Sequence, residues 1–81
     1  MPRFFFHIYD EASIRDEDGI ELADSEAARA AALAGARSMM CDRLSRGRLS
    51  LHHRIEVEEE GGRIVLVLPF ADAIVIEGRE G

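Results

Sequence analysis

The sequence predicts an α+β fold, a two-layer β-β-α-β-β sandwich in which one antiparallel or mixed four-stranded sheet carries a single long helix on one face. Two observations predict it. One continuous helix-forming stretch lies at about 24–46, and alternating β-type sequence lies on both sides of it. With 81 residues, of which 47% are hydrophobic, the chain is expected to form a single domain over 1–81 with one small core.

The stretch before the helix predicts two strands. In residues 3–10, RFFFHIYD, aromatic and branched residues occupy both sets of alternating positions, which favours an inner strand over an edge strand. Residues 10–13 form a turn, and 13–16 return as a short second strand. The acidic run at 16–19, DEDG, is then a tight turn that leads to the helix.

The helix is expected from about 24 to 46. Asp24 suits the N-cap because its carboxylate accepts free N–H groups of the first turn, and Gly47 supplies the C-terminal stop. Arg29 and Arg43 lie within the apolar arc, so their charged heads must reach past the rim of the sheet. At helical spacing the apolar residues of that arc are Ala28, Ala32, Leu33, Ala36, Met39, Met40 and Leu44.

Two further strands are expected at 54–59 and 63–68, joined by a turn at 60–62. The first alternates apolar with charged residues, but the second is apolar on both faces. Either it is a central strand with both faces covered, or one of its faces meets another protein chain. Pro69 ends its pairing. The tail at 71–77, ADAIVIE, adds three branched residues that one sheet and one helix can hardly bury, and its secondary structure stays open.

The relative lengths of the elements favour a homodimer. A helix of about 22 residues is roughly 33 Å long, whereas strands of six or seven residues reach roughly 20–23 Å. The helix should overhang the sheet by about two turns, which must be covered by the 49–51 segment or by a second subunit. The residues expected at the dimer interface are Met39, Met40, Leu44, Val65, Val67, Ile74, Val75 and Ile76.

Composition argues against several classes of partner. The net charge of −6 disfavours nonspecific binding to nucleic acid or to an anionic membrane surface. The single cysteine, Cys41, cannot form an internal disulfide. Neither a signal peptide nor a transmembrane span is recognisable, so a cytoplasmic location and no membrane partner are expected.

One basic segment stands out in this acidic chain. Arg43, Arg46, Arg48 and Arg54 occur with no acidic residue between 43 and 54. They could contact a small anion or RNA. The alternative is that they complement the helix C-terminus and acidic runs, such as 58–60, on a neighbouring element or subunit. Because no exposed aromatic residues are interleaved with them, the alternative is favoured.

Two residues are weighed as nucleophile or base. Pro2, freed of Met1, would carry an amine suited to general-base chemistry, as in the small tautomerases, but those enzymes place a helix directly after the first strand. Cys41 needs a neighbouring base to act as a nucleophile, and Met40 and Asp42 offer none. Packing is the expected role of Cys41, and no catalytic residue is expected in the chain.

Metal and cofactor binding are not expected. The stretch from Asp16 resembles the opening of a calcium loop, yet Ala27 stands where the bidentate glutamate is required. His52 and His53 would point to opposite sides of an extended segment, without carboxylate or cysteine ligands at suitable spacing. His7 is expected to be a partly buried residue with a hydrogen-bond partner.

Four stretches resemble a family of short bacterial proteins known only as a domain of unknown function. The resemblance covers about residues 2–72 and implies no activity. The stretches are PRFFFH, the D-E-x-G-x-E-L pattern at Asp16, Glu17, Gly19, Glu21 and Leu22, the helical EAARAAA, and GRIVLVLPF. A fainter similarity, to the small β-β-α-β domain of HicB-type antitoxins, is based on strand order and the Ala-rich helix alone, and a shared fold does not determine function.

Two functional hypotheses follow. The first is a small non-enzymatic protein-interaction module that acts as a homodimer, with an unknown protein partner also open. The second is a regulatory or antitoxin-like protein that binds a protein partner or nucleic acid through the basic 43–54 segment. An enzyme is not expected.

Overall fold

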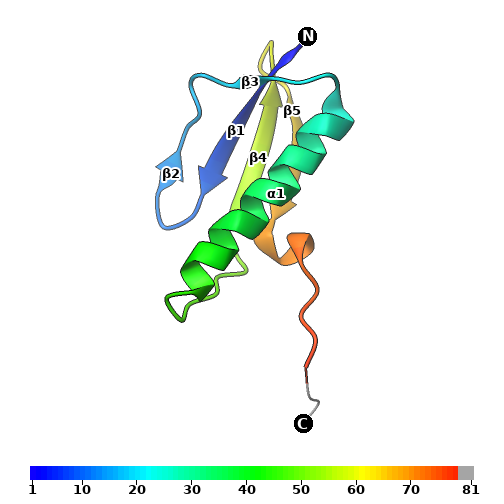
Figure 1. Cartoon of the computed structure of the whole chain (residues 1–81). Helices are drawn as coiled ribbons and strands as arrows, with labels where there is room; N and C mark the ends of the chain where they lie inside the picture. The colour runs from blue at the N-terminus through cyan, green and yellow to red at the C-terminus, as the bar shows by residue number, and fades with distance from the viewer. Residues whose placement is uncertain (79–81) are drawn as a thin grey trace.

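The computed structural model describes residues 1–78 and shows an antiparallel sheet with one long helix running diagonally across one face (Figure 1). The α+β prediction is therefore confirmed. In chain order the elements are β1 (Arg3–Tyr9), β2 (Ser13–Ile14), β3 (Ile20–Glu21), α1 (Ser25–Leu44), β4 (Arg54–Glu59), β5 (Ile64–Pro69) and the 3-10 helix η1 (Phe70–Ala73).

The sheet has five strands instead of the four predicted. Its order is β2-β1-β4-β5, and β3 also pairs with β1, through Phe4 and Ile20. The fifth strand arises because the segment before the helix pairs with the start of β1, in addition to the short hairpin at the end of β1. The expected strand at 13–16 is limited to β2, because Asp16 leaves the ladder to make the turn described below.

In the sheet, β1 is an inner strand and β5 is an edge strand. As predicted, β1 is an inner strand, with β4 on one side and the two short strands on the other. The doubly apolar β5 lies at the edge, which excludes one of the two alternatives, a central strand with both faces covered. The hairpin turn places β5 beside β4, whose other side is paired with β1 over six residues, and after Pro69 the described chain continues as η1 and not as another strand.

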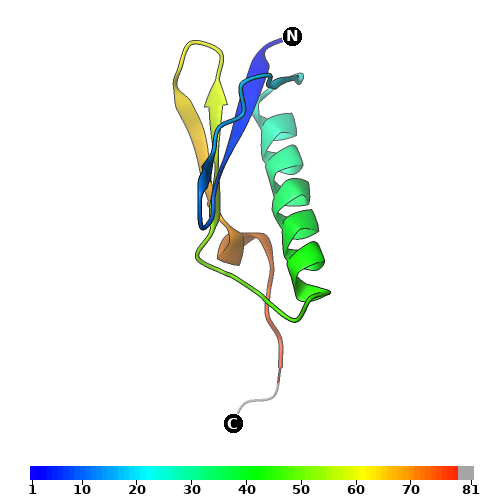
Figure 2. The ribbon, with the colours of Figure 1, turned by 90° about the vertical axis from the view of Figure 1, so that its left-hand side faces the viewer.

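The antiparallel register determines which side chains lie under the helix. Directly opposite residues share a face of the sheet, and Figure 2 shows that the helix forms a second layer against one face only. The residues that these pairings place on the helix side are Phe4, Phe6, Ile8, Ile55, Val57, Leu66 and Leu68. A bulge between Val57 and Glu58 in the β4–β5 pairing leaves Val65 without a partner in the ladder.

The helix packs on this face through a stripe of small side chains. Its buried residues are Ala28, Ala32, Ala36 and Met40, which follow one another at intervals of four. Asp24 caps the N-terminus as predicted, with its carboxylate accepting the Ala27 N–H at 2.9 Å. The helix ends at Leu44, two residues earlier than expected, and the chain leaves it through Gly47, whose φ of +82° is a conformation that glycine adopts readily.

The end of the helix is covered in part by its own chain. Met40 is buried in the core, against which Leu51 also packs, whereas Leu44 and Leu49 are exposed. The connection into β4 is tied to η1, because the Ala71 N–H donates to the Leu51 carbonyl at 3.2 Å. The open question about the 71–77 tail is answered by η1 followed by an irregular segment up to residue 78.

Candidate functional site

The edge strand β5 combines an apolar sequence with an unpaired side. Among the strands of residues 1–78 it pairs only with β4, so its outer side is unpaired. Between Ile64 and Pro69 it carries no charged residue. Val67 is 52% exposed and Ile64 is 44% exposed, and their pairing with Glu56 and Glu58 places both on the face away from the helix.

The residues expected at a dimer interface fall into three groups. Met40 lies inside the core of its own chain, so it is not available to a second copy. Met39, Val65 and Ile74 are half-buried against that core. The exposed members are Leu44, Val67, Val75 and Ile76. Of the exposed members, Val67 alone lies on a strand, and only there can backbone hydrogen bonds add to side-chain contact.

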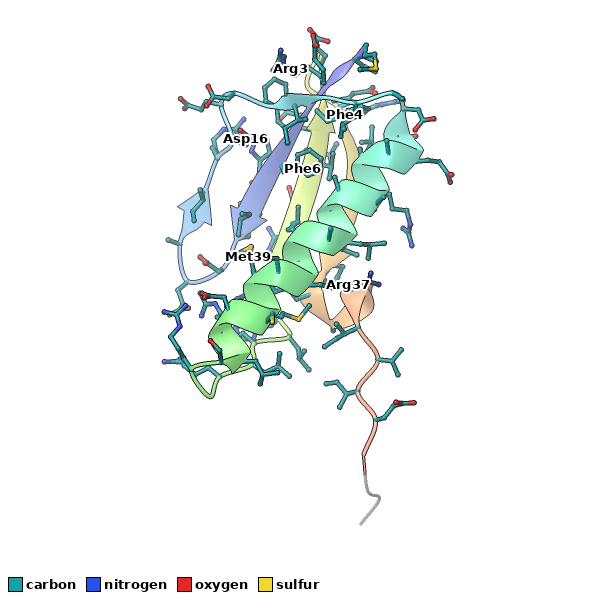
Figure 3. All side chains as sticks on the ribbon, viewed as in Figure 1. Arg3, Phe4, Phe6, Asp16, Arg37 and Met39 are labelled. Carbon is teal, nitrogen blue, oxygen red and sulfur yellow. The ribbon has the colours of Figure 1, made fainter. Side chains whose placement is uncertain are left out.

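A second apolar surface, which the sequence did not reveal, lies between α1 and β1. It is a groove of about 340 Å³ lined by Phe6, Ile8 and Ile20 on the sheet side and by Ala31, Gly35 and Met39 among others on the helix. Figure 3 shows Phe6 on β1 and Met39 on the helix. The groove exists because the helix lies over β4 and β5 and leaves part of β1 uncovered. Helical periodicity predicts which face of the helix is buried, but it could not indicate which strands the helix covers.

The open face of the sheet carries a hydrogen-bonded histidine. His7 is 2% exposed and bonds through Nε2 to Glu58 Oε1 at 2.8 Å, while its Nδ1 accepts the Asp16 N–H at 3.1 Å. Because Nδ1 accepts, Nε2 carries the proton. Arg15 lies 3.5 Å from the same Glu58 oxygen. Both ring nitrogens are therefore committed to structural bonds, which is the role expected for His7.

Asp16 organises the turn of the D-E-x-G pattern. Its carboxylate accepts N–H bonds from Phe6, Asp18 and Gly19 at 3.0–3.2 Å. Partial burial acts to raise the pKa of Asp16, but these three backbone donors outweigh it and the pKa is lowered. Gly19 has a φ of +70°, and a Cβ there would lie 2.8–2.9 Å from atoms of Arg3, Phe4 and Phe5. The acidic run is thus a structural turn.

Three of the four arginines of the basic segment are paired with carboxylates. Arg43 reaches past the rim of the sheet, as expected, to Asp10 at 3.3 Å and Glu11 at 3.1 Å. Arg46 pairs with Asp42, one helical turn earlier. The bonded Ala12 N–H lowers the pKa of Asp10, against a smaller opposing effect of burial, and Arg43 lowers it further.

Arg54 is paired on the open face of the sheet. Its Nε bonds to Glu56 at 2.8 Å, and its guanidinium lies 4.3 Å from the centre of the Tyr9 ring. Arg46 and Arg54 thus pair with acidic residues close to them in the sequence, and of these three arginines only Arg43 pairs with acidic residues of another segment. None of these partners belongs to the 58–60 run named in the alternative. A hollow beside Met39 is lined by three of the segment's arginines, Arg43, Arg46 and Arg48, together with the acidic Glu11 and Asp42. The charge available to an anion is therefore much smaller than four arginines suggest.

The other weighed residues have local roles or none. His53 is buried beside Phe70, and its Nδ1 is buried without a hydrogen-bond partner. His52 lies exposed against His53, and Cys41 is exposed. Within residues 1–78, no three His, Cys, Asp or Glu side chains come together in a way that could hold a metal ion.

The sequence matches one known protein family. A family model described as Domain of unknown function (DUF6894) matches residues 3–71. The chain belongs to this family. The match confirms the predicted resemblance over nearly the same range, and it includes the whole sheet and α1. A relationship to HicB-type antitoxins is not shown.

The other comparisons add no relative to the DUF6894 match. Neither a search of curated proteins nor a search of solved structures found a match. In the described part of the chain, no helix combines the length and the apolar character that crossing a membrane requires.

Proposed function

We propose that this DUF6894 chain is a non-enzymatic protein-interaction module that works as a homodimer in the cytoplasm. The observation that carries the proposal is the edge strand β5, which is apolar throughout and, among residues 1–78, has no strand paired on its outer side. Proteins ordinarily protect edge strands with charges, prolines or bulges. In β5 the bulge lies near one end, at Val65, and Pro69 lies at the other, so the centre around Val67 is unprotected.

Other exposed apolar residues support the same proposal. Val75 is 84% exposed and Ile76 is also exposed, both in the irregular segment that follows η1. Burial of such exposed apolar side chains against a second copy would be favourable. A homodimer would cover the edge and shield it from unspecific strand pairing.

Sedimentation equilibrium tests the proposal. The expected result is a particle of twice the 9.0 kDa chain mass, dissociating on dilution. Val67→Lys places a solvated charge at the centre of the edge and should shift the chain to monomer. Ala34→Lys, at an exposed helical position, is the matched control and should leave the dimer intact. A single 9.0 kDa species at every concentration would refute the homodimer.

The antitoxin-like alternative is tested separately, by measuring binding to nucleic acid. Binding to RNA or DNA that weakens with salt, and that is reduced in the double variant Arg46→Ala, Arg48→Ala, would favour it. The pairing of Arg43, Arg46 and Arg54 with carboxylates supports the opposite expectation, which is no salt-dependent binding in the unmodified chain.

A further inference from the structure

We infer that two copies of the chain join through their β5 strands in an antiparallel pairing that places Val67 directly opposite Val67 of the second copy. The two sheets then become one continuous sheet across a twofold axis. This inference deepens the proposed homodimer and depends on it.

The direction of the backbone groups in β5 follows from one hydrogen bond. The Phe70 N–H donates to the His53 carbonyl at 2.8 Å, so this pair bonds across β4 and β5. In an antiparallel ladder bonded and non-bonded pairs alternate. Leu68 and Leu66 therefore point their backbone groups toward β4, whereas Pro69 and Val67 point theirs outward. Pro69, which lacks an N–H, stands where an edge strand tolerates proline.

Only a few registers bring the outward backbone N–H and carbonyl groups of one β5 opposite those of the second copy. Pro69 has no donor, and Val65 lies at the bulge, where the regular alternation is interrupted. Val67 is the residue that offers both an outward N–H and an outward carbonyl in regular strand geometry. Centring the pairing on Val67 gives two reciprocal N–H to carbonyl bonds at the axis. A register that pairs Val67 with Val65 would depend on the bulged residue for half of its bonds.

The side chains fit the same register. Directly opposite residues share a face, so the exposed Val67 side chains of the two copies meet on the open face. Leu66 meets Leu68 of the second copy on the helix face, and the two helices lie on the same side of the joined sheet. On the helix face, a hollow of about 200 Å³ lies between Val65 and Leu66 of β5 and the first turns of α1, near Arg29.

Cysteine cross-linking tests the register in the full chain. In a Cys41→Ser background, Val67→Cys should form a disulfide-linked dimer under mild oxidation. The Cα atoms of a bonded antiparallel pair are about 5.5 Å apart, which lies within the range that a disulfide spans. Ile64→Cys, exposed on the same strand and face, is the matched control. In this register its two copies lie too far apart, and it should remain largely unlinked.

A backbone variant tests the hydrogen bonds. Val67→Pro removes an outward N–H without removing a bond to β4, so circular dichroism should stay unchanged while the dimer is lost. Val67→Thr keeps the N–H and should remain dimeric. If the unmodified chain is dimeric but Val67→Cys does not cross-link faster than Ile64→Cys, the inferred register is overturned and the homodimer stands. A monomeric unmodified chain overturns both.

Discussion

The two faces of the sheet are built on different principles. On the covered face, apolar side chains of β1, β4 and β5 pack against a narrow stripe of alanines on α1, so the layers approach closely. On the open face, polar groups are held by specific partners, such as His7 by Glu58 and Arg54 by Glu56 and Tyr9. Exposed apolar residues remain there mainly along β5.

Because of this difference, we expect the two faces to contribute differently to the free energy of unfolding. The free energy of unfolding is expected to depend mainly on burial under the helix, because apolar burial is the dominant favourable term in folding. The open face contributes local order through hydrogen bonds, each of which is worth about 1 kcal/mol net. Association is expected at the edge of the sheet, where neither kind of contact is complete. Substitutions on each face should therefore have effects of different size.

The largest effect is expected for Phe70→Ala. Phe70 is fully buried at the end of β5, in η1, which packs against α1. Truncation removes apolar burial and leaves a cavity, so the free energy of unfolding should fall by about 3–5 kcal/mol. Urea titration followed by circular dichroism, at constant protein concentration, measures it. Val75→Ala, at an exposed position, should change the value by less than about 0.5 kcal/mol. Equal effects of the two variants would contradict the stated role of the covered face.

A smaller loss is expected from overfilling the covered face. Ala36 is fully buried in the helical stripe, so Ala36→Leu must push the helix from the sheet and should cost about 1–3 kcal/mol. Ala34→Leu adds the same atoms at an exposed position of the same helix and should be nearly neutral. Thermal unfolding of the pair measures the difference. A neutral Ala36→Leu would mean that the helix can move away from the sheet without cost.

The smallest of the three losses of stability is expected at Asp16, whose carboxylate bonds to the backbone of β1. Asp16→Asn should lower the free energy of unfolding by about 1 kcal/mol at pH 7, because an amide cannot accept all three N–H bonds. The lowered pKa of Asp16 in the folded chain means that its ionised carboxylate stabilises the fold above the unfolded pKa of about 3.9. That contribution is lost as the pH falls through the folded pKa.

The difference between the unmodified chain and Asp16→Asn should therefore be constant well above pH 3.8, the ordinary pKa of an aspartate, and should shrink as the pH falls below that value. Asp18→Asn is the matched control, because its carboxylate accepts none of these bonds. Urea titrations of the three chains across this range provide the measurement. A difference that grows toward acid would contradict the bonding described for Asp16.

Much of the fold could be predicted because local signals agreed with one another. Asp24 and the run of alanines predicted the helix start and its buried face, and the alternation in β1 predicted an inner strand. The fifth strand escaped prediction because β3 has only two residues and no recognisable alternation. The surface features were predicted less well. Met40 and Leu44 share one helical arc, yet Met40 belongs to the core whereas Leu44, the last residue of the helix, is exposed.

The sequence by itself determined the class of the fold, the position of its helix and the apolar character of β5, because propensity, periodicity and capping act over a few neighbouring residues. The tertiary structure decided the strand order, the place of β5 at the edge, the pairing of Arg43 with Asp10 and Glu11, and the groove beside β1. Those features depend on contacts between residues far apart in the chain. Local patterns set which side chains are apolar or charged, but long-range pairing sets which of them another molecule can reach.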